Sequence, residues 1–130
     1  MKWYTRAAEQ GDAGAQVSLG NMYKNGLGVE KDEKKAVGLY TQAAEQGDAQ
    51  AQVSLGNMYK NGLGVEKDEK KAAKLYKKAA TQDNTEAKYN LGTLYENGLG
   101  VGKDEKKAAD LYTQAGEQGN AAAQYSLGGK

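Results

Sequence analysis

Residues 15–36 read AQVSLGNMYKNGLGVEKDEKKA, and residues 51–72 repeat this stretch letter for letter. The shorter motif NGLGV within it begins at residues 25, 61 and 97, so the period is 36 residues. An active site is normally assembled once, from residues that different parts of the chain bring together. A verbatim repeat at a fixed period instead indicates a structure made of similar units that stack on one another.

The period divides the chain into three full units between two partial ones. The first two full units agree at 29 of 36 positions, and the first and third agree at 23. We therefore predict a single solenoid domain over residues 1–130. Its predicted units are a partial repeat at residues 1–11, full repeats at 12–47, 48–83 and 84–119, and a partial repeat at 120–130.

Each full unit is expected to form two helices. In the first helix, Ala15, Leu19 and Tyr23 recur at i, i+4 and i+8 and form an apolar stripe. Gln16 lies at the edge of this stripe, where its amide is expected to reach water. The second helix also carries one apolar stripe, made of Ala36, Leu39, Tyr40 and Ala43.

Polar residues and glycines mark the ends of the predicted helices. N-cap positions, where a side-chain oxygen accepts a hydrogen bond from a backbone N–H, are predicted at Asp12, Asp32, Asp48, Asn84 and Asn120. Gly26 is expected to end the first helix in the left-handed region of backbone space. At the joint before the third full unit Asp83 replaces glycine, and Asp tolerates that backbone better than most residues do.

Short helices of this kind need neighbours. Helices of about 12–14 residues are marginally stable alone, so each must bury its apolar stripe on the helices beside it. The predicted fold class is all-α, a right-handed α/α superhelix (solenoid) of 36-residue helix-turn-helix repeats.

The composition argues against catalysis and cofactor binding. The chain contains no His and no Cys, which removes the commonest general base and the thiolate ligands of metals. Lys and Arg number 18 against 17 Asp and Glu, so no strong global field attracts nucleic acid. We therefore expect no enzyme, no metal or cofactor site and no nucleic-acid partner.

No targeting or membrane segment is visible. The first ten residues, MKWYTRAAEQ, lack the apolar core of a secretory signal. The mean hydropathy is −0.85, and no run approaches the ~18 apolar residues that a membrane span needs. We expect a soluble chain without membrane insertion, and the compartment stays open.

Fourteen positions of the repeat follow the pattern A-x-x-x-L-G-x-x-Y-x-x-G-x-G-V-x-x-D-x-x-K-A-x-x-L-Y-x-x-A-A. In the first full unit they are Ala15, Leu19, Gly20, Tyr23, Gly26, Gly28, Val29, Asp32, Lys35, Ala36, Leu39, Tyr40, Ala43 and Ala44. This pattern resembles the Sel-one-like repeat (SLR) family, a relative of the tetratricopeptide repeats. The resemblance implies an adaptor or scaffold that binds a protein or peptide, since members are mostly adaptors for protein complexes.

The resemblance also implies where a partner binds, because first helices line the concave groove of tetratricopeptide-like superhelices. The first-helix face that points away from Leu19 and Tyr23 is therefore the predicted peptide-binding site. Its predicted residues are Val17, Asn21, Lys24, Gln50, Val53, Asn57, Lys60, Glu86, Tyr89, Thr93, Glu96 and Tyr125.

Two features of this face leave alternatives open. Tyr89 and Tyr125 stand where the other units have valine, and they either anchor a partner or fill space against the next unit. Asn21 with Lys24, and the equivalent pair in the second unit, either hold a peptide backbone or are solvated surface residues. The remaining tyrosines recur at two fixed repeat positions and are expected in the core: Tyr4, Tyr23, Tyr40, Tyr59, Tyr76, Tyr95 and Tyr112.

Lysines crowd the second helix of the second full unit. Spacings of 4 and 7 place four of them on one outer face: Lys70, Lys74, Lys77 and Lys78. A solvated face is the favoured interpretation, with a contact to nucleic acid or an acidic protein as the alternative.

The two ends favour a second function. Trp3 stands where Leu39 and its equivalents are expected in the core, so both ends should expose apolar stacking surfaces. We therefore keep self-association through open ends as an alternative, in which the chain is a self-assembling structural element or an engineered repeat scaffold.

Overall fold

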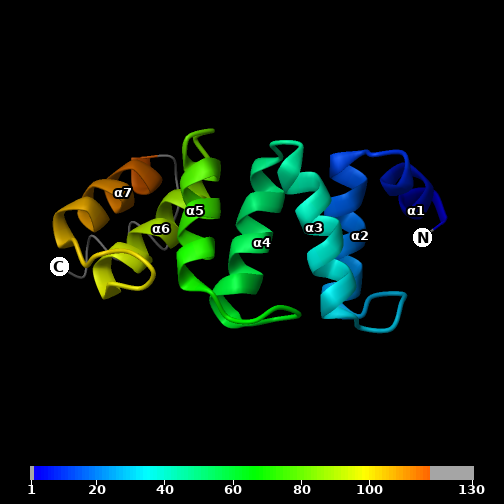
Figure 1. The fold of residues 1–130 in the computed structure, drawn as a ribbon. Coiled ribbons are helices and arrows are strands. Elements are labelled where there is room, and N and C mark those ends of the chain that lie inside the picture. The colour runs from blue at the N-terminus through cyan, green and yellow to red at the C-terminus, as the bar shows by residue number, and fades with distance from the viewer. Residues whose placement is uncertain (1, 118–130) are drawn as a thin grey trace.

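A computed structural model describes residues 2–117 of the chain. Over this range it contains seven helices and no strand. The helices are α1 Lys2–Glu9, α2 Ala13–Asn25, α3 Glu33–Glu45, α4 Ala49–Asn61, α5 Glu69–Ala80, α6 Thr85–Asn97 and α7 Glu105–Glu117. They form one row with α1 and α7 at opposite ends, and each helix packs mainly on the helices before and after it in the chain (Figure 1). The predicted all-α solenoid is confirmed.

The predicted caps start the helices. The side chains of Asp12, Asp48 and Asn84 each accept a hydrogen bond of 2.8 Å from the backbone N–H three residues later. Asp32 and its equivalents Asp68 and Asp104 cap the second helices in the same way, at 3.0–3.1 Å. These bonds satisfy N–H groups that have no partner inside the helix. The predicted cap Asn120 lies outside the described residues.

Left-handed backbone ends the first helices and forms the joints between units. Gly26 has a φ of 66°, as predicted, and its equivalents Gly62 and Gly98 have 65°. At the joints Gly47 has a φ of 90°, and Asp83 takes its place in the next unit with a φ of 68°. Asp83 is the one residue other than glycine with positive φ in the described chain.

Each unit owes its tight helix pair to one glycine and one tyrosine. Tyr40 is fully buried, and a Cβ on Gly20 would lie 2.7 Å from its ring. The pairs Gly56 with Tyr76 and Gly92 with Tyr112 repeat this contact. Because no other residue leaves room for the ring, the Leu-Gly dipeptide of the repeat is a packing requirement.

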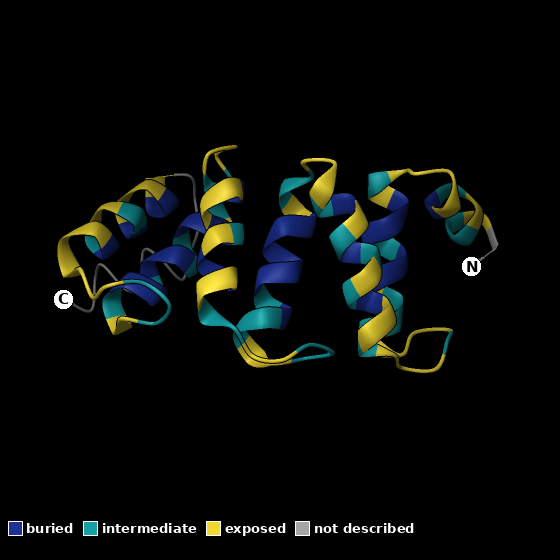
Figure 2. Cartoon of the chain, viewed as in Figure 1, coloured by how far each residue is buried: buried dark blue, intermediate teal, exposed yellow. Residues whose placement is uncertain are grey.

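The expected core positions are mostly buried. Leu19, Leu55 and Leu91 are each 5% exposed. Of the seven repeated tyrosines, four are buried as predicted: Tyr40, Tyr76, Tyr95 and Tyr112. The other three are half-buried: Tyr4, Tyr23 and Tyr59. Figure 2 shows the result in the helices: α4 is mostly buried, whereas α3, α5 and α7 carry long exposed stripes.

The expectation that Gln16 reaches water is wrong. Its side chain is buried, and its Nε2 donates to the Ala8 carbonyl and to Gln42 Oε1, both at 3.1 Å. Its Oε1 accepts a bond of 3.0 Å from Gln46 Nε2. With both ends of the amide bonded inside the protein, burial carries no large penalty. Gln16 thus ties α2 to α1 and to the end of α3.

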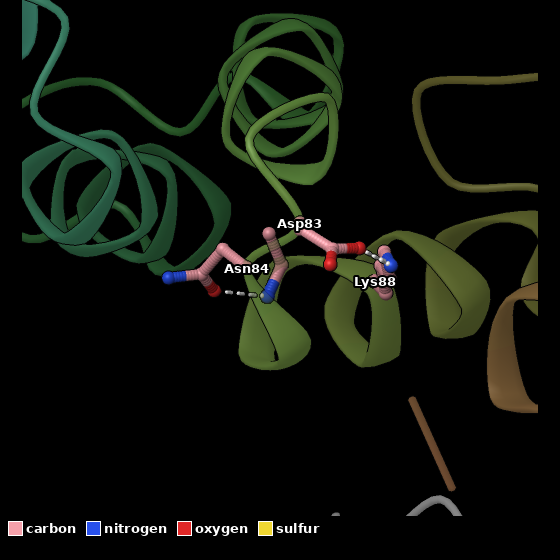
Figure 3. A network of polar contacts seen from close by, with 4 residues as sticks. Asp83, Asn84 and Lys88 are labelled. Atoms are coloured by element: carbon pink, nitrogen blue, oxygen red, sulfur yellow. Dashed lines mark hydrogen bonds and ion pairs between the residues drawn. The ribbon is translucent and has the colours of Figure 1, made fainter. Parts of the chain in front are cut away.

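The next unit repeats this amide contact, and the third replaces it with an ion pair. Gln52 donates to the Ala44 carbonyl at 3.4 Å and accepts a bond of 3.1 Å from Gln82. The equivalent residue in the third unit is Lys88, which is buried and forms an ion pair with the exposed carboxylate of Asp83 (Figure 3). The joint glycine and the buried glutamine have therefore changed together into a carboxylate and an ammonium.

Candidate interaction surfaces

The predicted first-helix face is only partly accessible. Asn21, Gln50 and Glu86 are exposed. Six further predicted residues are half-buried: Lys24, Asn57, Lys60, Tyr89, Thr93 and Glu96. Tyr125 lies outside the described residues.

Val17 and Val53 do not line an open groove, so this part of the prediction is wrong. Val53 is fully buried, and Val17 is 9% exposed. Val53 belongs to a core cluster with Ala87 and Leu91 of the next unit. The physical reason is that an interior first helix packs on both flanking second helices and also meets the next first helix, as α2 meets α4. Its buried surface is therefore wider than one apolar stripe.

Tyr89 fills space at the position of these valines. Its ring centroid lies 5.6 Å from that of Tyr112, and its side chain packs against the core of the last units while staying half-buried. Ring pairs at this distance add to the stability that burial provides.

The two asparagines of this face are held from inside the core. The Tyr40 hydroxyl donates to Asn21 Oδ1 at 2.5 Å, and the Tyr76 hydroxyl donates to Asn57 Oδ1 at 2.5 Å. Burial raises the pKa of Tyr40 to about 12, so this hydroxyl keeps its proton at neutral pH. Each amide oxygen is thereby held by a core hydroxyl, while the Asn21 side chain stays exposed and that of Asn57 half-buried.

The third unit holds its tyrosine differently. Thr93 stands in place of the asparagine, and the Tyr112 hydroxyl donates to Glu96 Oε1 at 2.8 Å. Burial and the Glu96 carboxylate raise the pKa of Tyr112 above its ordinary value. Glu96 occupies the position of Lys24 and Lys60, so the predicted face changes from basic over α2 and α4 to acidic over α6.

Three cavities that the sequence reasoning missed lie between successive second helices. We call them furrow 1, between α1 and α3; furrow 2, between α3 and α5; and furrow 3, between α5 and α7. Their volumes are about 400, 250 and 530 Å³. Of the residues of the predicted first-helix face that the structure describes, none lines any of these furrows.

The furrows are one site repeated at the 36-residue period. Each has a leucine and a tyrosine of the first helix in its lining, together with an apolar side chain from each second helix. In furrow 2 these are Leu55, Tyr59, Ala44 and Leu75. These positions recur in the sequence, but helical spacing alone does not distinguish a furrow lining from a closed core.

A lysine lies over the tyrosine ring in every furrow. Nζ of Lys35, Lys71 and Lys107 lies 5.0, 5.2 and 5.2 Å from the ring centroids of Tyr23, Tyr59 and Tyr95. These are cation–π distances, so the ring face and the ammonium attract each other. Each furrow therefore combines an apolar lining with a positively charged edge.

Two further features bear on function. Among residues 2–117, no group of three or more acidic side chains is placed to hold a metal ion. In the same range, no helix has the length and apolar character needed to cross a membrane.

Comparisons with known proteins agree with this architecture. The family model of the Sel1 repeat matches residues 1–12, 13–48, 49–84 and 85–120. No curated protein sequence gives a significant match.

Solved structures give close matches. A protective antigen of uropathogenic Escherichia coli strains that displays an SLR fold is 41% identical, with a TM-score of 0.95. A Sel1 repeat protein from Oxalobacter formigenes is 40% identical, with a TM-score of 0.86, and cysteine rich protein B of Helicobacter pylori is 28% identical, with a TM-score of 0.72.

The coverage of these matches is unequal. They cover 98%, 92% and 94% of this chain but 27%, 49% and 87% of the respective relatives, so the chain spans about a quarter of the first and half of the second. Sel1 repeat proteins generally serve protein interaction and are typically non-catalytic. With the repeat matched from residue 1 to residue 120, this chain belongs to the Sel1 repeat family.

Proposed function

We propose that this chain is an adaptor that holds a peptide or protein segment along its first-helix face. The observation that carries the proposal is the pair of asparagines anchored by buried tyrosine hydroxyls. Because the core fixes each amide, Asn21 and Asn57 offer donors to a peptide carbonyl at little cost in side-chain entropy. Each also has a lysine one turn away, Lys24 and Lys60, that suits a carboxylate.

The charges along this face favour one orientation of the bound segment. Lysines flank the asparagines on α2 and α4, whereas Glu86 and Glu96 lie on α6. A segment with carboxylates toward α2 and basic side chains toward α6 complements this gradient.

The test uses peptides selected on the whole chain from a displayed library. We expect K24E/K60E to weaken binding of the selected peptides by about tenfold or more, as for close charge pairs. The control is K34E/K106E, which reverses two exposed lysines that line no furrow and do not belong to the predicted first-helix face. If calorimetry gave the same affinity for every selected peptide with K24E/K60E as with the unaltered chain, the first-helix face would not be the site.

Self-association is the second candidate, and one observation favours it. Trp3 is 73% exposed, and its ring meets that of Tyr4 edge-on at 5.3 Å. A large exposed indole is a common anchor of protein interfaces. We expect sedimentation to show oligomers at millimolar concentration that W3S dissolves. A chain that stays monomeric at that concentration would contradict this candidate.

A further inference from the structure

We propose that furrows 2 and 3, with the lysines of α5 between them, bind a second partner: an acidic amphipathic protein segment. This goes beyond the function proposed above because it uses the second helices, and the furrow linings share no described residue with the predicted first-helix face. Apolar side chains of the segment enter the furrows, and its carboxylates meet the lysines.

The furrow linings account for the apolar part of the segment. In furrow 2, Tyr59, Leu75 and Ala44 are half-buried, so apolar surface stays in contact with water. The equivalent residues of furrow 3 include Leu111 and Ala80, which are also half-buried. An inserted leucine or phenylalanine side chain removes this surface from water, which is favourable.

The charges differ between furrows that are otherwise alike, and this difference selects the partner. At two equivalent lining positions furrow 1 has Gly38 and Gln42, whereas furrow 2 has Lys74 and Lys78. Furrow 3 has Asp110 and Gln114 at these two positions but gains Lys77 at a third, where furrow 1 has Thr5. Counting every charged lining residue, lysines outnumber carboxylates in furrows 2 and 3, whose acidic residues are Glu45 and Asp110, whereas one lysine and one carboxylate line furrow 1. The furrows on both sides of α5 are therefore basic, and furrow 1 is close to neutral.

The exposed lysines of α5 form no ion pair within the described chain, although Glu45 and Asp110 line the same furrows. Lys74, Lys77 and Lys78 are exposed, and no described carboxylate lies within ion-pairing distance of them. Lys74 and Lys78 are one helical turn apart, a spacing at which like charges destabilise a helix. A bound carboxylate relieves this repulsion, so the ridge favours an anionic partner.

The furrows favour a protein over a nucleic acid. Non-specific binding of single strands depends on aromatic faces on which bases stack. Here Lys71 and Lys107 already lie over the rings of Tyr59 and Tyr95. The apolar linings and the occupied rings together fit a chain that alternates carboxylates with apolar side chains.

The experiment selects peptides rich in Glu, Asp, Leu and Phe from a displayed library on the whole chain and measures their affinity by fluorescence anisotropy. We expect K74E/K78E to weaken the selected peptides by about tenfold or more, and added salt to weaken them progressively. The matched control K34E/K106E should leave their affinity unchanged. Unchanged binding to K74E/K78E, or a library that yields no such peptide, would overturn the proposal.

A gain-of-function variant keeps the test independent of folding defects. Gly38 and Gln42 are exposed, and a Cβ on Gly38 meets nothing within 4 Å. Q42K removes one acceptor of Gln16 Nε2, which keeps its bond to the Ala8 carbonyl, and circular dichroism of the variant checks that the fold is retained. G38K/Q42K therefore gives furrow 1 the two lysines of furrow 2, and we expect peptides long enough to reach all three furrows to bind more tightly than they bind the unaltered chain. An unchanged affinity of these longer peptides would count against the furrows.

Two control measurements distinguish the furrows from a general polyanion site and from the first-helix face. A single-stranded oligonucleotide that binds as tightly as the peptides and competes with them would show a general polyanion site and overturn the proposal. K24E/K60E should not affect these peptides if the two faces are distinct. Loss of binding in K24E/K60E alone would place the acidic segment on the first-helix face, which overturns the furrow site and leaves the function proposed above standing.

Discussion

The first two full units and the third share a backbone but hold it with different polar contacts. In the first two, buried glutamines form hydrogen bonds with neighbouring side-chain amides, and asparagines accept hydrogen bonds from the tyrosine hydroxyls. In the third, Lys88 pairs with Asp83, and Glu96 receives the hydroxyl of Tyr112. Neutral partners have thus been exchanged for charged ones, while the glycine–tyrosine pairs and the first-helix leucines that set helix spacing are unchanged. In each case the buried polar group keeps a hydrogen-bonding or ion-pairing partner, although the partner differs between units.

In the interior units, the loop after the first helix lies close to the backbone of the preceding unit. Breaking this close approach should give the largest loss in the free energy of unfolding. A Cβ on Gly64 would lie 2.6 Å from the backbone of Glu33 in the preceding unit, whereas one on Gly28 would meet nothing within 4 Å. Both residues have positive φ. We expect G28A to lower the free energy of unfolding by about 1–2 kcal/mol through backbone strain alone. G64A should cost a further 1–3 kcal/mol, roughly, from the clash. Urea titrations that gave both variants equal stability would contradict this packing.

Removing the carboxylate at the charged joint should give the next largest effect. D83G restores the joint residue of the first units but leaves the Lys88 ammonium buried without this partner. We expect a loss of about 1–2 kcal/mol, at the low end for a buried charge because Asp83 is largely exposed and the lysine stem is flexible.

The double variant D83G/K88Q sharpens this result. It restores the glycine and glutamine of the neutral joint, so it should regain most of the stability that D83G loses. Thermal unfolding of the single and double variants forms the cycle that measures the coupling. If the double variant were no more stable than D83G, the two residues would not be coupled.

Removing the tyrosine hydroxyls should change the free energy of unfolding by smaller amounts, which differ between the units. Y40F removes a bond to a neutral amide and should cost about 0.5–1 kcal/mol. Y112F removes a bond to a carboxylate and should cost about 1–1.5 kcal/mol, because water can solvate the half-buried Glu96 once the hydroxyl is gone. Denaturant midpoints of the two variants check the order. Equal losses would mean that the charge of Glu96 adds nothing to this bond.

Raising the pH should leave the free energy of unfolding unchanged near neutrality and should lower it progressively in alkaline solution. Burial raises the pKa of Tyr40 to about 12, from 10.0. Since the folded state holds this proton more tightly than the unfolded state, the contribution to stability is complete below pH 10 and is lost as pH rises through 12. Tyrosinate absorbance followed against circular dichroism tests this. Full ionisation of Tyr40 near pH 10 in the folded chain would contradict it.

Helix positions and core leucines were predictable because local physical chemistry decides them. Asp32 and Gly26 mark helix ends by capping and backbone conformation, which depend on a few neighbouring residues. The exposure of Asn21 and Glu86 followed from helical spacing in the same way. The burial of Val53 did not, because the helix that covers it lies in the next unit.

The furrows were missed for a related reason. The lining of furrow 2 comes from α3, α4 and α5, and the sequence pattern of any one helix shows only an apolar stripe. Whether such a stripe is fully covered depends on how far apart two second helices lie. That separation is set by the packing of the first helix between them.

By itself, the sequence determined the period, the helix ends and the family, since each depends on local residues or on simple recurrence. The tertiary structure decided which repeated side chains are buried, as for Gln16 and Val53, and which partners their polar groups find. It also decided that Leu75 and Tyr59 line an open furrow beside charged lysines. The physical reason is that burial is a property of all the helices around a residue, and in a solenoid those helices belong to three successive units.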